Sequence, residues 1–113
     1  MKFNGIRIAA LLLGATIAGG PALADELKVV EIKIENHTFQ PSSVEVPANT
    51  LVKLLIENLD STPEEFESYQ LNREKIISGG ETGTVYVGPL DPGTYPFFGE
   101  FNPDTAQGEL IVK

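Results

Sequence analysis

Short stretches of alternating apolar and charged residues constrain the fold of this 113-residue chain more than any other feature. In Leu27–Glu35, the apolar residues Val30, Ile32 and Ile34 alternate with charged ones, which is the period of a half-buried β-strand. Turn-forming residues interrupt the chain about every 8–12 residues, as they do in all-β sandwiches and barrels. The sequence therefore predicts an all-β sandwich or barrel of seven to eight short strands.

The alternation and the turn signals also locate the strands. We expect turns at Phe39–Ser43, at Ser78–Gly83 and at Asp91-Pro92-Gly93. The segment Glu65–Leu71 is read as extended, with a short helical turn at its start as the alternative. The full set of expected strands is Leu27–Glu35, Val44–Val46, Leu51–Glu57, Glu65–Leu71, Lys75–Ile77, Thr84–Val87, Thr94–Phe98 and Glu109–Val112.

The first 24 residues have the features of a cleaved export signal. Lys2 and Arg7 make a positive start, residues 8–18 are apolar, and Ala22-Leu23-Ala24 matches a small-residue cleavage site. We expect cleavage after Ala24, which leaves one domain over residues 25–113. The apolar run is shorter than the roughly 20 residues of a membrane-spanning helix. We therefore expect a periplasmic protein whose mature part does not insert into a membrane.

The composition excludes several kinds of site. The chain has no cysteine, which rules out disulfides, thiolate nucleophiles, zinc–thiolate sites and iron–sulfur clusters. Loss of Lys2 and Arg7 with the signal leaves six basic residues against 16 acidic ones, a formal charge of −10. Such a surface repels nucleic acid and attracts cations and basic protein surfaces. It also keeps an exported protein in solution, and the charge alone does not choose between these roles.

Four segments resemble, in order, the sequence pattern of the cupredoxins. The tyrosine and the Pro-Gly turn of the third segment are the most specific part, and together the four span nearly all of residues 25–113. The resemblance implies a cupredoxin-like Greek-key β-sandwich. The segments are Phe39-x-Pro41 with the following Val44–Thr50, Asn58-Leu59-Asp60, Leu90-x-Pro92-Gly93-x-Tyr95-x-Phe97, and Gly108–Val112.

A narrower resemblance is to small periplasmic cupredoxin-like proteins, similar to the cupredoxin domain of EfeO-type proteins. The segments that carry it are Thr62–Ser68, Arg73-Glu74-Lys75, Val87–Leu90 and Phe98–Gly108. Members of that group accompany bacterial high-affinity iron permeases. The resemblance therefore implies a part in periplasmic iron handling, with periplasmic or membrane iron-uptake components as partners. In that group, histidine is usual at the places of Tyr69 and Asn102, so this chain departs from a nitrogen-rich site.

Other residues stand at the four ligand places of a blue-copper protein. By the same resemblance, the first histidine place is Glu64 and the thiolate place is Gly99. The second histidine place is Asn102, and the axial place is Gln107. A blue site needs a thiolate and two imidazoles around the metal. We therefore expect no blue copper.

Carboxylates remain as candidate metal ligands at that end of the fold. Three of them lie at the start of an expected strand, and two lie in the loop that a cupredoxin folds over the same end. Strand alternation places Glu65 and Glu67 on the outward face, and Glu64 on the opposite face with Phe66, which we expect to point into the core. Oxygen ligands suit hard cations such as iron, manganese, calcium or magnesium, and the cofactor expected to bind weakly here is iron, copper or manganese. A solvated rim without any ligand is an equally open interpretation. These candidate ligands are Glu64, Glu65, Glu67, Glu100 and Asp104.

These observations favour an accessory protein of iron or metal uptake that binds a metal ion through carboxylates or docks onto an uptake partner. A ferroxidase-like redox protein and a metal-free interaction domain are the alternatives. His37 is the only histidine, and we expect it in an exposed turn. The glycines of Gly79–Gly83 join two expected strands, which does not match a phosphate-binding loop. We therefore identify no catalytic residue and no cofactor-binding residue beyond the metal candidates.

Overall fold

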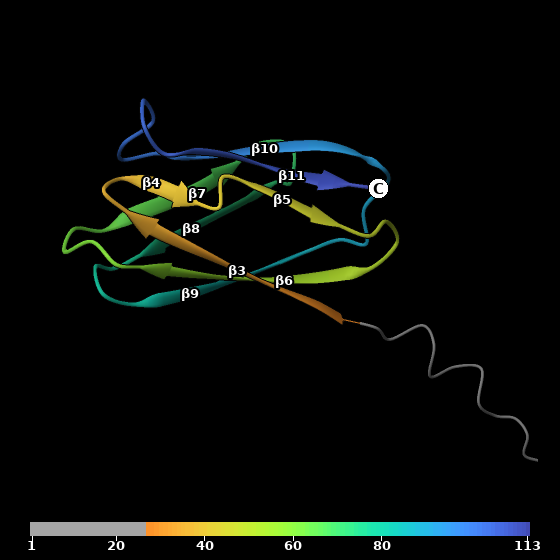
Figure 1. Cartoon of the computed structure of the whole chain (residues 1–113), viewed down its shortest axis with the longest axis horizontal. Coiled ribbons are helices and arrows are strands. Elements are labelled where there is room, and N and C mark those ends of the chain that lie inside the picture. Colours follow the sequence, from red (N-terminus) through yellow and green to blue (C-terminus); the bar gives the residue numbers. More distant parts are fainter. Residues whose placement is uncertain (1–26) are drawn as a thin grey trace, which may run out of the picture.

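Residues 27–113 form two β-sheets that pack face to face in the computed structural model (Figure 1). The expected export signal, residues 1–24, lies outside the described residues. Residues 27–113 contain no helix long and apolar enough to cross a membrane. The strands are, in chain order, β3 (Leu27–Glu35), β4 (Thr38–Gln40), β5 (Ser43–Val46), β6 (Leu51–Asn58), β7 (Glu64–Ser68), β8 (Arg73–Ile77), β9 (Thr82–Val87), β10 (Gly93–Gly99) and β11 (Gln107–Val112).

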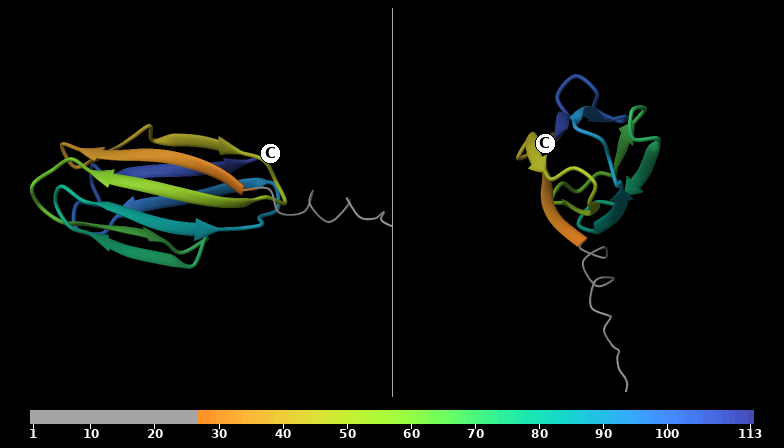
Figure 2. Two further views of the ribbon diagram at one scale, coloured as in Figure 1. Left: turned by 90° about the horizontal axis from the view of Figure 1, so that it is seen from below. Right: turned by 90° about the vertical axis from the view of Figure 1, so that its right-hand side faces the viewer.

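The strand order describes a sandwich in which the chain passes repeatedly between the sheets. One sheet has five strands in the order β5-β11-β10-β7-β8, and the other has four in the order β4-β3-β6-β9. Strands β7 and β8 pair antiparallel, but β3 pairs in parallel with β6, and β5 with β11. Parallel neighbours cannot be joined by a tight hairpin, so the connections cross between the two layers seen in Figure 2. The predicted all-β sandwich is confirmed, with nine strands in the described residues instead of seven to eight.

The additional strand, β4, occupies part of a segment that was predicted to be a turn. It pairs antiparallel with β3, which brings Phe39 opposite Ile34 and into the core. Asn36 and His37 form the turn between the two strands, and both have positive φ angles, of 55° and 58°. Their N–H groups donate to the carboxylate of Asp60 at 2.8 and 2.9 Å, and these bonds, that of His37 foremost, lower the pKa of Asp60. His37 is exposed, as predicted.

Seven of the other strands differ at one or both ends from their predicted bounds. Strand β10, for example, begins at Gly93, which was predicted to lie in a turn. Strand β7 is extended from Glu64 and ends at Ser68, so the helical-turn alternative is wrong. Strand β9 begins at Thr82 and includes Gly83, which was predicted to lie in a turn. Gly83 pairs with Ile56, and a Cβ there would lie 2.7 Å from Cγ1 of Ile77. A glycine lets β8 approach this point of β9 closely.

The core is built from the inward-facing positions of both sheets. Three phenylalanines lie at its centre, with ring centroids 5.0 Å apart for Phe39–Phe97 and for Phe66–Phe97. Phe97 is buried and its neighbour Phe98 is half-buried, as the alternation along a strand requires. Because Phe66 points inward, its neighbours two residues away on β7, Glu64 and Ser68, also point inward.

Candidate functional site

Glu64 carries the one acidic side chain, among residues 27–113, that is buried; it is 1% exposed. Three N–H groups point at its carboxylate. The backbone N–H groups of Phe101 and Glu65 donate to Oε1 at 2.9 and 3.0 Å, and Nδ2 of Asn102 donates to Oε2 at 2.8 Å. A carboxylate satisfied in this way can be buried without the large penalty of an unpaired polar group.

Gly99 makes room for this carboxylate. Gly99 is buried beside Glu64, and a Cβ placed on it would lie 2.6 Å from Cδ of Glu64 and 2.7 Å from Cβ of Ala106. Carbon atoms do not approach this closely without displacement of one of them. The first histidine place, the thiolate place and the second histidine place, which are Glu64, Gly99 and Asn102, therefore meet at one point of the structure.

The axial ligand place lies away from these three residues, so the prediction that Gln107 occupies it is wrong. Gln107 is exposed, and its Nε2 donates to the carbonyl of Pro103 at 3.0 Å. It pairs with Phe98, which in turn pairs with Glu67, so all three lie on the outer face of the sheet. Ala106, which is fully buried, faces Gly99 instead.

These residues do not fit a blue-copper centre. The position holds a carboxylate, an amide, a glycine and an alanine, whereas a blue site requires a thiolate and two imidazoles. The only carboxylate present already accepts three hydrogen bonds. We therefore derive no copper chemistry from this position.

A second group of carboxylates lies on the outer face of the same strand. One oxygen from each of Glu65, Glu67 and Glu74 lies within 4.8 Å of the other two. The antiparallel register explains the group, because Glu74 of β8 lies directly opposite Glu67 and diagonal to Glu65. Glu100 follows Gly99 beside them, with its N–H donating to the carbonyl of Glu65 at 2.8 Å. We call Glu65, Glu67 and Glu74 the outer carboxylate cluster.

The surroundings of the outer carboxylate cluster disfavour the ionised form of Glu65 and Glu67. Partial burial is the largest cause that raises the pKa of both Glu65 and Glu67. Repulsion from Glu74 and Glu100 raises both values further. Both salt bridges found among the described residues, His37–Asp60 and Lys113–Glu45, lie outside this cluster. A bound cation would relieve the repulsion.

The structure therefore divides the five predicted metal candidates. Glu65 and Glu67 lie together on the outer face, while Glu64 points into the interior. Glu100 lies beside the outer carboxylate cluster, and Asp104 is an exposed loop residue outside the group of three. Sequence analysis missed Glu74 as a candidate ligand. The expected strand began only at Lys75, so Glu74 lay outside it, whereas β8 begins at Arg73 and pairs Glu74 with Glu67.

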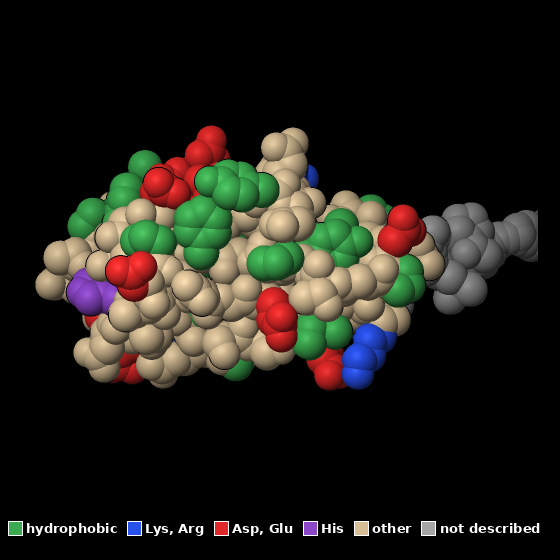
Figure 3. Space-filling view, turned by 90° about the horizontal axis from the view of Figure 1, so that it is seen from above, with side chains coloured by type: hydrophobic (Ala, Val, Ile, Leu, Met, Phe, Trp, Pro, Cys, Tyr) green, Lys and Arg blue, Asp and Glu red, His purple; other side chains and the backbone are tan. Residues whose placement is uncertain are grey.

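Exposed apolar residues stand next to the outer carboxylate cluster in the fold: Ile76 pairs with Glu65, Tyr69 follows β7, and Phe101 follows Glu100. Tyr69, Ile76 and Phe101 are 73%, 58% and 47% exposed. The ring of Tyr69 lies 5.5 Å from that of Phe98, centroid to centroid. Figure 3 shows acidic and hydrophobic side chains next to one another on this face of the molecule. The mixture of charge and apolar surface is typical of a contact region as well as of a cation site.

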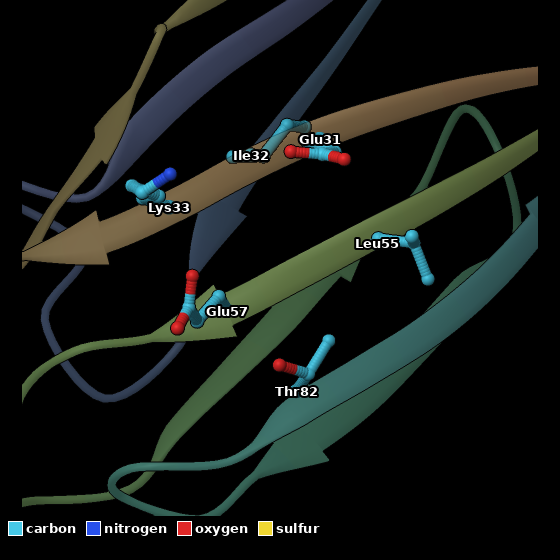
Figure 4. A pocket seen from close by; sticks show the side chains of 6 residues that line it. All are labelled: Glu31, Ile32, Lys33, Leu55, Glu57 and Thr82. Carbon is cyan, nitrogen blue, oxygen red and sulfur yellow. The ribbon is translucent and has the colours of Figure 1, made fainter.

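A separate hollow of about 250 Å³ lies on the outer face of the four-stranded sheet (Figure 4). Its side chains come from three neighbouring strands, and Lys33 lies opposite Glu57 in the register of β3 and β6. Charges of both signs are therefore already close together, and the hollow contains neither a nucleophile nor a base in a catalytic arrangement. Its lining residues are Glu31, Ile32, Lys33, Leu55, Glu57 and Thr82.

Comparisons with known proteins agree with this geometry. Residues 7–112 match the family model of the Cupredoxin-like domain. An uncharacterized protein of Rickettsia prowazekii (strain Madrid E) is 49% identical over 89 residues, which cover 79% of this chain and 71% of that protein.

Solved structures with a similar fold include two copper proteins. Auracyanin A, a "blue" copper protein of Chloroflexus aurantiacus, is 17% identical with a TM-score of 0.68, covering 78% of this chain and 100% of that chain. The metal binding domain of the Cu(I)-exporting P-type ATPase CopA of Streptococcus pneumoniae is 12% identical with a TM-score of 0.67, covering 79% and 88%. At these identities, the likeness establishes the fold and not the function.

Proposed function

Because the chain belongs to the cupredoxin-like domain family, we propose that it is a metal-handling member that binds its cation on the outer face of β7 and β8. The ligands are the carboxylates of the outer carboxylate cluster, Glu65, Glu67 and Glu74, with Glu100 beside them. The ion would be divalent and weakly bound, and the buried position of Glu64 would take no part.

One observation carries this proposal: three carboxylate oxygens from separate side chains lie within 4.8 Å of one another. Oxygen ligands at such spacing suit iron and manganese better than they suit Cu(I), which prefers sulfur. Glu65 and Glu67 are half-buried and Glu74 is exposed, so an ion must still order flexible side chains, and we expect a dissociation constant on the order of 10⁻⁴ M.

We further propose a periplasmic setting and an accessory role in iron uptake. The export-signal features of residues 1–24 and the resemblance to proteins that accompany iron permeases support this setting. The excess of acidic residues would favour contact with basic surfaces of an uptake component. A weak, exposed site suits a protein that passes a cation to a partner, because release is then fast.

Calorimetric titration tests the proposal. The mature protein, residues 25–113, is titrated with Mn(II), with Cu(II), and with Fe(II) under anaerobic conditions. The charge-neutral variants Glu65→Gln and Glu67→Gln should each weaken binding at least about tenfold, since each removes one of few ligands. Glu81→Gln, which changes an exposed carboxylate in the turn before β9, should bind as the unmodified protein does. Absence of binding for every ion, or equal binding by all variants, would contradict the proposal.

A metal-free interaction domain is the second candidate, favoured by the exposed Tyr69, Ile76 and Phe101 beside the carboxylates. A ligand that binds only the folded state must raise the melting temperature. If no ion raises it, the outer face would be a docking surface only. The ferroxidase-like alternative requires acceleration of Fe(II) oxidation by the copper-supplemented protein, a reaction that oxygen consumption measures directly.

A further inference from the structure

We propose that the Glu64 carboxylate has replaced a metal ion at the ligand end of this fold, as the link between β7 and the loop of residues 100–106. Three N–H donors hold the negatively charged carboxylate. The interior site that suits a cation in a copper protein therefore suits an anion in this chain. The inference is independent of the outer carboxylate cluster, because Glu64 points to the opposite face of β7.

The hydrogen-bond donors around Glu64 suit an anion. Phe101 and Asn102, which lie in the loop, and Glu65, which lies on β7, all direct N–H groups at the two oxygens of Glu64. Each N–H presents the positive end of its dipole. A cation placed here would face three such dipoles, whereas a carboxylate is stabilised by all of them.

The loop of residues 100–106 closes on itself beside this link. The N–H of Gly99 donates to the carbonyl of Ala106 at 2.8 Å, and the N–H of Asn102 donates to the carbonyl of Gly99 at 3.1 Å. The carbonyl of Asn102 accepts from the N–H of Ala106 at 2.9 Å. The backbone of Asn102 thus belongs to the closed loop while its side chain reaches Glu64. This side chain and the N–H of Phe101 fasten the loop to β7.

Glu64 fits this position only because residue 99 is a glycine. The carboxylate and Cβ of Ala106 together occupy the space that a Cβ at position 99 would need. A glutamine at position 64 would keep one oxygen for the N–H groups of Phe101 and Glu65, but its NH2 group would face the NH2 group of Asn102 unless the Asn102 amide turned over. A carboxylate accepts from all three donors as they stand, and its charge strengthens each bond.

Chemical rescue provides the test. Glu64→Ala removes from the side chain the atoms of one acetate ion and leaves the donors of Phe101, Asn102 and Glu65 around the space. We expect a lower melting temperature and, by hydrogen exchange, at least about tenfold faster exchange at the amide of Phe101, since this partly buried donor has lost its acceptor. Added acetate should restore part of both, because it would bind only the folded state.

Three comparisons make the result decisive. Sodium chloride at the same ionic strength should give no rescue, and neither should acetate added to Glu31→Ala, which removes an exposed carboxylate of β3. If Glu64→Ala does not fold, Glu64→Gln takes its place. Its uncharged oxygen is a weaker acceptor for the N–H of Phe101, so faster exchange there is again the expected result. Unchanged exchange at Phe101 in the folded variant, or rescue by chloride equal to that by acetate, would overturn the proposal.

Discussion

Glu64 and Glu65 are adjacent, chemically identical residues with opposite surroundings. Side chains alternate along β7, so Glu64 points into the sandwich, where three N–H groups meet it, and Glu65 points outward among other carboxylates. The alternation of the sequence predicted these directions. It could not predict the donors, because Phe101 and Asn102 lie 37 and 38 positions further along the chain.

The glycine at position 99 should be intolerant of a side chain. Gly99→Ala places a methyl group against Glu64 and Ala106, and we expect a loss of about 1–3 kcal/mol in the free energy of unfolding, as in other overpacked cores. Urea denaturation measures the loss. In the Glu64→Ala background the same change should cost less, because one of the two obstructing groups is gone. If Gly99→Ala lowers the free energy of unfolding equally in both backgrounds, the Glu64 carboxylate is not what excludes a side chain at position 99.

At the scale of elements, the hairpin of β7 and β8 creates the outer carboxylate cluster. Neither strand alone has three carboxylates on one face; pairing of Glu67 with Glu74 and the diagonal approach to Glu65 bring them together. The next strand in the sheet, β10, ends just before Glu100, whose negative charge also repels Glu65. Strand pairing therefore concentrates the negative charge on one face.

Glu74→Gln should stabilise the metal-free protein at neutral pH. Partial burial and repulsion raise the pKa values of Glu65 and Glu67 above the ordinary 4.5. As the pH rises above 4.5, the unfolded chain therefore loses these protons before the folded protein does, and the free energy of unfolding falls. Removal of the Glu74 charge lessens the fall, so the variant should melt at a higher temperature than the unmodified protein at pH 7.

Thermal melts from pH 4 to pH 7 measure this effect. The difference between the two proteins should vanish toward the acid end of the range and shrink in high salt, which screens exposed charges. A variant that melts at a lower temperature than the unmodified protein at pH 7 would show that Glu74 is held by a favourable contact instead.

At the scale of the whole molecule, three phenylalanines join the two sheets. Phe39 belongs to the four-stranded sheet, while Phe66 and Phe97 belong to the five-stranded one, and their rings are in contact across the interior. Without disulfides, packing of this kind must hold the sandwich together. Because Phe66 is anchored here, β7 is fixed in the orientation that turns Glu64 inward.

Phe97→Ala should be among the most damaging single changes to the fold. The ring is 1% exposed and contacts both other phenylalanines, so we expect a loss of about 3–5 kcal/mol. Phe101→Ala, which removes a ring that is 47% exposed, is the matched control and should change stability by less than about 0.5 kcal/mol. Guanidinium denaturation measures the free energy of unfolding of both variants. Similar losses in the two would show that the phenylalanine cluster is not the main source of stability.

The sequence by itself determined the all-β class, most strand positions, the inward direction of Glu64 and the absence of blue-copper ligands. These properties depend on alternation and residue chemistry, which are local. Tertiary structure alone decided that β4 is a strand, that Ala106 and not Gln107 faces Gly99, and that Glu74 joins Glu65 and Glu67. It also decided that three N–H donors surround Glu64. Each of these depends on register or loop closure, which bring together residues distant in the chain, and periodicity carries no information about such distances.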